Sequence, residues 1–372
     1  MVILSVDVSV FSSRGLLVVK GNNPTRVNWQ SVGKLLIHTF RSLCTNCWSS
    51  RAGFAVLFAL AFVNGANDVG KIVAGLIVAT KGDQPKPASI TRAVVWGALF
   101  SGVGSIAAIY VSGRLFLVFT QDLVKVPLGE SFALSVLVAA TVWVVATTLL
   151  RIPVSSTHTI IGAIVFLLIY LYGTSGIQWN VLLLRVLLPM AASPFLALLA
   201  TYVFHRLAHG RSAISGLGPG RVKILHWGSA ALTSFSRGIN DAPKMAALGF
   251  FLLPFSSQDS LWLPYAFVSL ALFIGSISWG RKITESLVSR EEQLDDDQRL
   301  RAGLTTAALV SAGAIFGAPI STTHVAAAAK AGARANDREV FWSTTGNIIL
   351  AWAITFPVAG LLTILASMLL PH

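Results

Sequence analysis

Long apolar stretches without a single charged residue dominate the chain from about residue 51 onward. A helix needs about 20 apolar residues to cross a bilayer, so each stretch is long enough for at least one span. The pattern predicts an all-α, multi-pass integral membrane protein. The charge-free stretches are residues 93–113, 131–150, 152–184, 260–280, 302–329 and 340–372.

Matching motifs divide these stretches into two related halves. Residues 64–71 read NGANDVGK and residues 237–244 read RGINDAPK, while residues 153–158 read PVSSTH and residues 319–324 read PISTTH. Landmarks that recur in the same order indicate an internal duplication. The expected organisation is a tail of unknown role at 1–50, a first transmembrane repeat at 51–205, a basic linker at 206–223 and a second repeat at 224–372.

Composition and charge support a membrane protein. Only 12% of the residues are charged, against about 25% in a soluble domain, and 31 Gly and 14 Pro predict that some helices are broken. The net charge of +13 lies mainly in the tail and the loops, as the positive-inside rule leads one to expect. We therefore expect lipid rather than nucleic acid as the surrounding partner, a cytoplasmic linker, and the plasma (inner) membrane as the location.

The first motif of each half places a carboxylate in a membrane segment. The apolar runs before Asp68 and Asp241 are short for a full span, so we expect a helix interruption at both positions. A charge at the bilayer centre costs roughly 2.5–3.5 kcal/mol on insertion scales, which favours a role in cation coupling over an ordinary interfacial loop. Lys71 and Lys244 lie three residues further on, where they share a helix face with the carboxylates and can neutralise them.

The second motif has the composition of an oxyanion site. Pro153 and Pro319 favour the first turn of a helix, and the residues after them bring hydroxyls and free N–H groups to the positive end of a helix dipole. Helix capping by the same hydroxyls is the simpler alternative. The predicted anion ligands are Ser155, Ser156, Thr157, Ser321, Thr322 and Thr323, with Asn67 and Asn240 adding amide donors.

Other polar residues carry weaker predictions. His158 and His324 close the second motifs and suit either a proton relay or packing. Arg237 lies inside the second Asn-Asp motif, where it can meet an anion. Cys44 and Cys47 form a CxxC pair, but a closed zinc site takes four ligands, and no metal site is predicted.

At these residues the sequence resembles the inorganic phosphate transporter (PiT) family of cation-coupled permeases. Residues 64–69 are similar to the family's Gly-Ala-Asn-Asp-Val-Ala-Asn signature, and residues 238–244 to its second, His-Gly-x-Asn-Asp-x-x-Lys. The resemblance implies inverted repeats with broken or re-entrant helices around a central phosphate site, a proton or sodium ion as coupling cation, and a homodimer. Gly70-Lys71 and Arg237 depart from these signatures and add positive charge, which weakens the case for a full set of sodium sites.

The motifs and the resemblance together predict a secondary active transporter. It would move inorganic phosphate by cation symport with alternating access, with no other cofactor. Asp68 and Asp241 cannot face an anion bare, because like charges repel strongly in a poor dielectric, so each must bind a cation, take a proton or pair with lysine. A permease for sulfate or another oxyanion, a channel, and a membrane-embedded enzyme are the alternatives. The only acid cluster, at 291–297, lies in a polar loop, which argues against the enzyme.

Overall fold

Helices joined by short turns make up nearly all of the computed structural model, which describes residues 29–77, 87–150, 154–207, 214–253, 261–291, 294–334 and 337–370. The chain divides into two compact units, Met1–Trp48 and Ser49–His372. The described part of the first unit is helix from Trp29 onward, and the side chains of Cys44 and Cys47 lie outside the described residues. Within the described ranges, the strand-like pairing is limited to one bridge, between Val124 and Ile177.

The elements follow one another along the chain as twelve α-helices and four short 3-10 or π segments in the described part. They are α1 (Trp29–Val73), η1 (Ala74–Leu76), α2 (Pro87–Val111), α3 (Gly113–Leu117), η2 (Val118–Asp122), α4 (Glu130–Leu149), α5 (Ser156–Tyr172), η3 (Thr174–Gly176), η4 (Val181–Leu187), α6 (Leu188–Leu207), α7 (Pro219–Phe250), α8 (Trp262–Ser278), α9 (Gly280–Glu291), α10 (Asp296–Phe316), α11 (Thr322–Ala333) and α12 (Arg338–Leu369).

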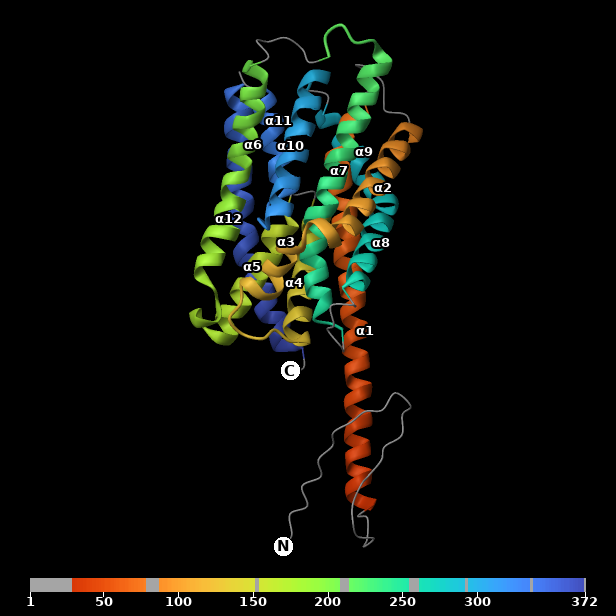
Figure 1. Cartoon of the computed structure of the whole chain (residues 1–372), viewed down its shortest axis with the longest axis vertical. Coiled ribbons are helices and arrows are strands. Elements are labelled where there is room, and N and C mark those ends of the chain that lie inside the picture. Colours follow the sequence, from red (N-terminus) through yellow and green to blue (C-terminus); the bar gives the residue numbers. More distant parts are fainter. Residues whose placement is uncertain are drawn as a thin grey trace. The chain divides into compact units, whose positions relative to one another are not determined.

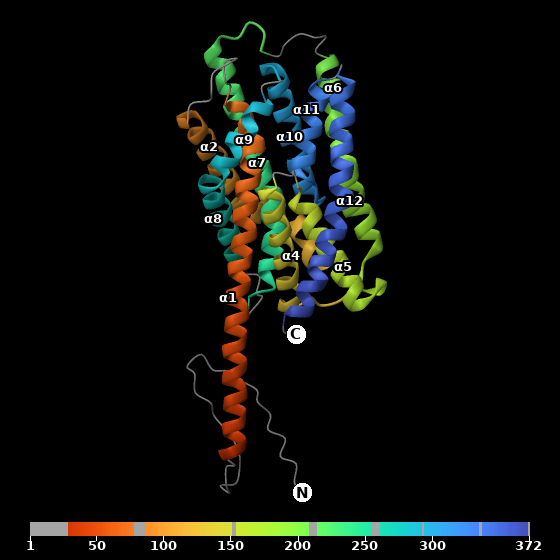
Figure 2. The ribbon, with the colours of Figure 1, turned by 180° about the vertical axis from the view of Figure 1, so that it is seen from behind.

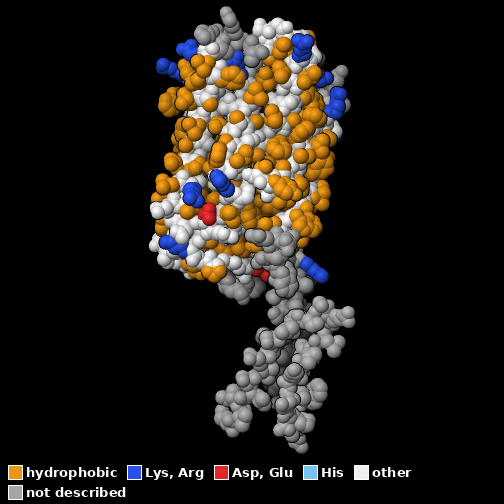
Figure 3. Space-filling model, in the orientation of Figure 1, with side chains coloured by type: hydrophobic (Ala, Val, Ile, Leu, Met, Phe, Trp, Pro, Cys, Tyr) orange, Lys and Arg blue, Asp and Glu red, His pale blue; other side chains and the backbone are white. Residues whose placement is uncertain are grey.

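The second unit has the surface and the helices of a membrane-spanning body. Figure 3 shows hydrophobic side chains over most of its visible face, with many of the Lys and Arg side chains towards its upper end. Five segments in the described ranges are long and apolar enough to cross a membrane. The chain is therefore an integral membrane protein, as predicted. The five segments are Arg51–Leu76, Ser89–Val111, Glu130–Leu149, Val181–Leu207 and Arg338–Leu369.

Both Asn-Asp motifs lie inside continuous helices, so the predicted interruption at these motifs is wrong. Helix α1 continues past Asp68 to Val73, and α7 continues past Asp241 to Phe250 with Pro243 inside it. A buried carboxylate that is neutralised by a lysine on the same helix face does not force the backbone to break. Figures 1 and 2 show that α7 runs in the opposite direction to the part of α1 in the second unit.

The helix breaks lie at the second motifs instead, as predicted. Helix α4 turns back into α5, and α10 turns back into α11, which gives two helical hairpins. The first hairpin lies in the lower part of the body and the second in its upper part (Figure 1). Their tips meet, since the Thr157 hydroxyl donates to the carbonyl oxygen of Ile320 at 3.2 Å. Pro319 precedes the N-cap Ser321 rather than standing in the first helical turn, and Pro153 lies outside the described residues.

The helices of each half pack mainly against those of the other half. A Cβ atom on Gly65 of α1 would overlap the carbonyl oxygen of Leu272 in α8, and one on Gly238 of α7 would overlap that of Ser101 in α2. Glycine is needed where two backbones approach this closely. Helices of opposite halves also pack together at α5 and α12 and at α6 and α11. This crossed packing brings all four motifs into one buried region.

Candidate functional site

The first Asn-Asp motif forms an ion pair that reaches across to the second half. The Lys71 ammonium lies 2.7 Å from Asp68 Oδ1 and donates to the Thr323 hydroxyl at 3.2 Å. Thr323 also lies 3.5 Å from Asp68 Oδ1. The lysine therefore joins a carboxylate of the first half to a hydroxyl of the second.

The second Asn-Asp motif repeats this arrangement in the other direction. The Lys244 ammonium lies 2.9 Å from Asp241 Oδ1 and donates to the Thr157 hydroxyl at 2.6 Å. Because Thr157 and Thr323 hold the same place in their motifs, the two lysines make equivalent contacts across the halves. We call the six residues the crossed Lys-Asp-Thr sets: Lys71, Asp68 and Thr323, and Lys244, Asp241 and Thr157.

Arg237 lies between the two carboxylates. Its side chain is 1% exposed, and its Nε lies 3.4 Å from Asp241 Oδ2 and 3.9 Å from Asp68 Oδ2. Nη2 donates to the backbone oxygen of Asn64 at 2.8 Å, whereas Nε and Nη1 have no hydrogen-bond partner among the described residues. A buried guanidinium with two unused donors is suited to an anion.

The asparagines hold the carboxylates in place. Asn67 and Asn240 each donate to the aspartate that follows them, at 3.1 Å in both halves. Asn240 also donates to the Ile320 carbonyl at 3.1 Å and to the Thr322 hydroxyl at 3.2 Å. These amides are thus engaged within the protein and connect α7 to the tip of the second hairpin.

The six motif hydroxyls do not all point to one centre. Ser155 and Ser321 cap their helices, because each side chain accepts from the backbone N–H of the histidine three residues on, at 3.4 and 3.2 Å. Thr157 and Thr323 contact the lysines, and Thr322 accepts from Asn240. The two serines therefore match the simpler capping alternative, whereas the three threonines contact side chains of the Asn-Asp motifs. Ser156 is buried at the start of α5.

His158 and His324 meet where the two hairpins touch. Their ring centroids are 4.9 Å apart, and the Trp352 indole N–H donates to His324 Nδ1 at 3.0 Å. Because Nδ1 accepts this bond, the neutral His324 ring carries its proton on Nε2. The Trp352 ring stacks on His158 at 5.6 Å between centroids. A proton relay through these rings stays a prediction.

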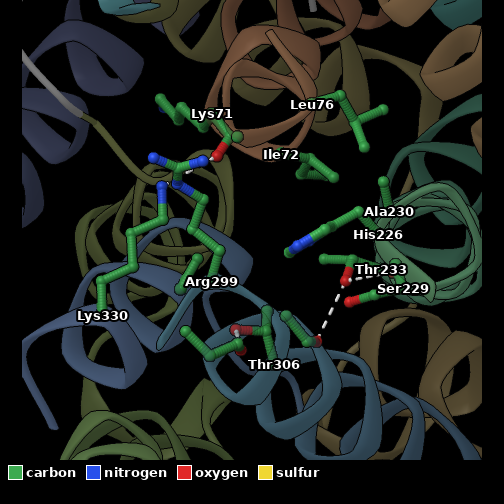
Figure 4. A pocket seen from close by; sticks show the side chains of 14 residues that line it. Lys71, Ile72, Leu76, His226, Ser229, Ala230, Thr233, Arg299, Thr306 and Lys330 are labelled. Carbon is green, nitrogen blue, oxygen red and sulfur yellow. Dashed lines mark hydrogen bonds between the residues drawn. The ribbon is translucent and has the colours of Figure 1, made fainter. Parts of the chain in front are cut away.

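A hollow lies beside Lys71, which is the residue that the hollow shares with the crossed sets. It is formed by the end of α1, the beginning of α7, and α10 and α11 (Figure 4). We call it the basic vestibule. Its polar lining consists of Lys71, His226, Ser229, Thr233, Arg299, Thr306 and Lys330.

The known proteins that match the sequence are described as phosphate transporters. The Phosphate transporter family matches residues 64–213 and 209–363. The chain belongs to this family. A probable low-affinity inorganic phosphate transporter of Mycobacterium tuberculosis is 31% identical over 82% of this chain and 74% of its own length. One of Bacillus subtilis is 27% identical over 85% and 96%.

Fold comparison agrees with the family assignment. A solved structure titled "The sodium-dependent phosphate transporter" superposes with a TM-score of 0.73, at 18% identity over 86% of this chain and 98% of that one. The family and the relatives confirm the prediction of a phosphate transporter and not an enzyme.

Sequence reasoning missed several polar groups around the site. Asn64 donates to Asp241 Oδ2 at 3.2 Å, although its place in the repeat, opposite Arg237, could have indicated it. The Ile320 carbonyl lies inside a predicted motif, but a backbone oxygen is not visible in the sequence, and the Trp352 indole comes from an apolar stretch. Arg299 and Lys330 are charged, whereas the equivalent positions of the other half are the apolar Ala133 and Ile164.

Proposed function

We propose that the chain moves inorganic phosphate across the membrane by proton symport with alternating access. The observation that carries this proposal is the pair of crossed Lys-Asp-Thr sets with Arg237 between their carboxylates. Each lysine contacts both halves, and a substrate bound there would contact both as well. Sites of this kind, where two repeats meet, are typical of secondary transporters.

The charge of the site favours an anion. Three cationic side chains and two carboxylates leave one formal positive charge in a region where the arginine and both carboxylates are almost fully buried. Burying an uncompensated charge is costly, so a monovalent anion stabilises the site. The monoanion of phosphate matches this charge, whereas sulfate is a dianion at neutral pH and leaves an excess negative charge.

The contacts of the lysines support a proton rather than sodium as the coupling cation. The structural neighbour is titled sodium-dependent, which favours cation coupling in this fold. Here each carboxylate already has an ammonium within 3 Å, at 2.7 Å for Asp68 and 2.9 Å for Asp241. A second cation beside the same oxygen atoms would repel the lysine. A proton that phosphate itself carries needs no binding position beside the carboxylate oxygens.

The residue roles in this proposal differ in part from the predicted ones. Phosphate would be held by Arg237, Lys71 and Lys244 with Thr157 and Thr323. Asp68 and Asp241 would accept hydrogen bonds from the proton that phosphate carries. Asn67, Asn240 and Thr322 would position the carboxylates and the hairpin tip. Ser155 and Ser321 would shape the site as caps, with Ser156 beside them.

The opposite directions of α1 and α7 (Figure 1) support an arrangement of residues 51–205 and 224–372 as inverted repeats. Such a pair allows one half to rock against the other around a fixed site. The two matched family segments meet inside the linker 206–223, in keeping with a boundary there. A homodimer in the plasma membrane, with a cytoplasmic linker, completes the proposal.

Uptake into liposomes tests this function. Purified protein should accumulate labelled phosphate under an inward proton gradient and respond weakly to a sodium gradient, and sulfate should compete poorly. Asp68→Asn and Asp241→Asn should each abolish concentrative uptake, whereas Asp122→Asn, at an exposed pair with Arg185, should leave it unchanged. Full gradient-driven uptake by both site variants, or uptake driven only by sodium, would contradict the proposal.

A further inference from the structure

The basic vestibule has an unusual set of charges for a hollow inside a helical membrane protein. Lys71, Arg299 and Lys330 line it together with His226, and none of its described lining residues is acidic. Figure 4 shows the Arg299 and Lys330 side chains on the same side of the hollow as Lys71. Asp68 and Asp296 pair with Lys71 and Arg299 from outside this lining. The side chains that line the hollow are nevertheless cationic or uncharged, and such a lining attracts an anion.

Arg299 has donor capacity left for such an anion. Its Nη1 is 3.2 Å from Asp296 Oδ1, and its side chain is 12% exposed. Among the described residues its buried Nε has no hydrogen-bond partner. Lys330 is fixed by donation to the backbone oxygen of Lys71 at 3.3 Å, which places its charge beside the first crossed set.

The duplication shows that the fold does not require these charges. The Asn-Asp motifs recur after 173 residues and the second motifs after 166, so each vestibule residue has a counterpart in the other half. For six of these residues the counterparts are buried or partly buried apolar residues that belong to the main core or pack against it. Ser229, Thr233, Arg299, Gly303, Thr306 and Lys330 correspond to Val56, Leu60, Ala133, Leu137, Ala140 and Ile164.

We propose that the basic vestibule is a second phosphate site, where inorganic phosphate binds before it enters or after it leaves the crossed sets. The inference rests on the proposed function, and it adds a site on one side only. The arginine fork and the lysine ammonium suit phosphate oxygens. Ser229 lines the same space, whereas the Thr233 and Thr306 hydroxyls donate to backbone oxygens and add only polar surface. Lys71 belongs to both sites, so an anion that passes from one to the other stays close to a positively charged side chain.

Counting bound phosphate tests this site. Calorimetric titration of the detergent-purified full chain with inorganic phosphate should give two binding events per chain. The double variant Arg299→Gln/Lys330→Gln should keep the central event and lose the other, since each lost charge-assisted bond weakens binding by about tenfold. Arg299→Lys/Lys330→Arg should retain both events, and Lys223→Gln, an exposed cation at the same end of α7, should bind like the original chain.

The outcomes separate the second site from the proposed function. One binding event in the original chain, unchanged in the double variant, overturns the second site and leaves phosphate transport standing. No binding at all contradicts both. Two events that the double variant retains also overturn the site. Loss of the second event when phosphatidylglycerol is added to the original chain would assign the vestibule to a lipid headgroup and overturn the proposal.

Discussion

Arg237 is the residue on which the stability and the charge of the site both depend. It separates two buried carboxylates, and no second arginine is within ion-pair distance of either one in the described part of the chain. Removing one partner of a buried ion pair is far more costly than the pair itself is stabilising, because it leaves an uncompensated charge.

Arg237→Gln should therefore destabilise the protein by about 3–5 kcal/mol and lower its melting temperature in detergent. A matched control is Arg281→Gln, because Arg281 also pairs with an acid four residues on, Glu285, but at an exposed position. Exposed pairs of this kind contribute about 0–1 kcal/mol. Equal effects of the two substitutions on thermal unfolding would show that Arg237 does not hold the carboxylates together.

Lys71 is the residue whose substitution should change the coupling ion. Lys71→Asn frees Asp68 Oδ1 and puts an amide oxygen beside it, so the place of the ammonium becomes available to sodium. Phosphate uptake by this variant should fall about tenfold without sodium and recover in part when sodium is added. Lys330→Asn, which removes the nearby ammonium that donates to the backbone oxygen of Lys71, should gain no sodium dependence.

Stimulation by sodium is measured as initial uptake rates in liposomes at fixed pH and membrane potential. Equal sodium stimulation of the original chain and Lys71→Asn would mean that the Lys71 ammonium does not occupy the position of a bound sodium ion beside Asp68.

At the scale of helices, the close crossings at Gly65 and Gly238 hold α1 against α8 and α7 against α2. Ser276 and Ser101 add hydrogen bonds at the same two crossings, to the backbone oxygens of Gly65 and Ser234 at 3.1 Å in both cases. The two crossings are thus built alike, and the positions of both aspartates depend on them.

Gly65→Ala and Gly238→Ala should each destabilise the protein by about 1–3 kcal/mol, since the added methyl group forces backbones apart. Gly228→Ala, on the same helix α7, has open space around its Cβ position and should be neutral or stabilising by up to about 1 kcal/mol. Melting temperatures of the three variants test this. A similar shift for Gly228 and Gly238 would exclude close packing as the cause.

The sequence patterns predicted elements better than helix ends. The duplication, the spans and the pairing of Lys71 with Asp68 follow from periodicity and spacing, which are local properties. The continuous course of α1 through Asp68 did not follow, because an ion pair on one helix face removes the reason for a break. The contacts of Arg237 with both carboxylates depend on the crossing of two distant helices, and spacing along the chain carries no information about that crossing.

At the scale of the whole molecule, the two halves are alike at the crossed sets and unlike around them. The polar vestibule opens beside Lys71, whereas the equivalent space beside Lys244 is filled by apolar side chains such as Leu60 and Ile164, each buried. The Lys71 side chain is accordingly 17% exposed and the Lys244 side chain 0%, an asymmetry that fits one state of the proposed alternating access.

Accessibility of introduced cysteines should reveal this asymmetry. In a chain with Cys44 and Cys47 replaced by serine, Thr233→Cys should react with a membrane-impermeant thiol reagent far faster than Leu60→Cys, its repeat counterpart. Phosphate should slow the reaction of Thr233→Cys if an anion fills the vestibule. Equal reaction rates at the two positions would contradict a structure that is open on one side.

The crossed contacts of the two lysines also mean that neither half contains a complete site. Lys71 needs Thr323 and Lys244 needs Thr157, so any displacement of one half relative to the other changes both contacts together. Phosphate affinity and the relative position of the halves then belong to a single equilibrium, in which a ligand shifts the population of states by its difference in affinity for them. Either half expressed alone should bind phosphate weakly, and mixing the two halves should restore binding.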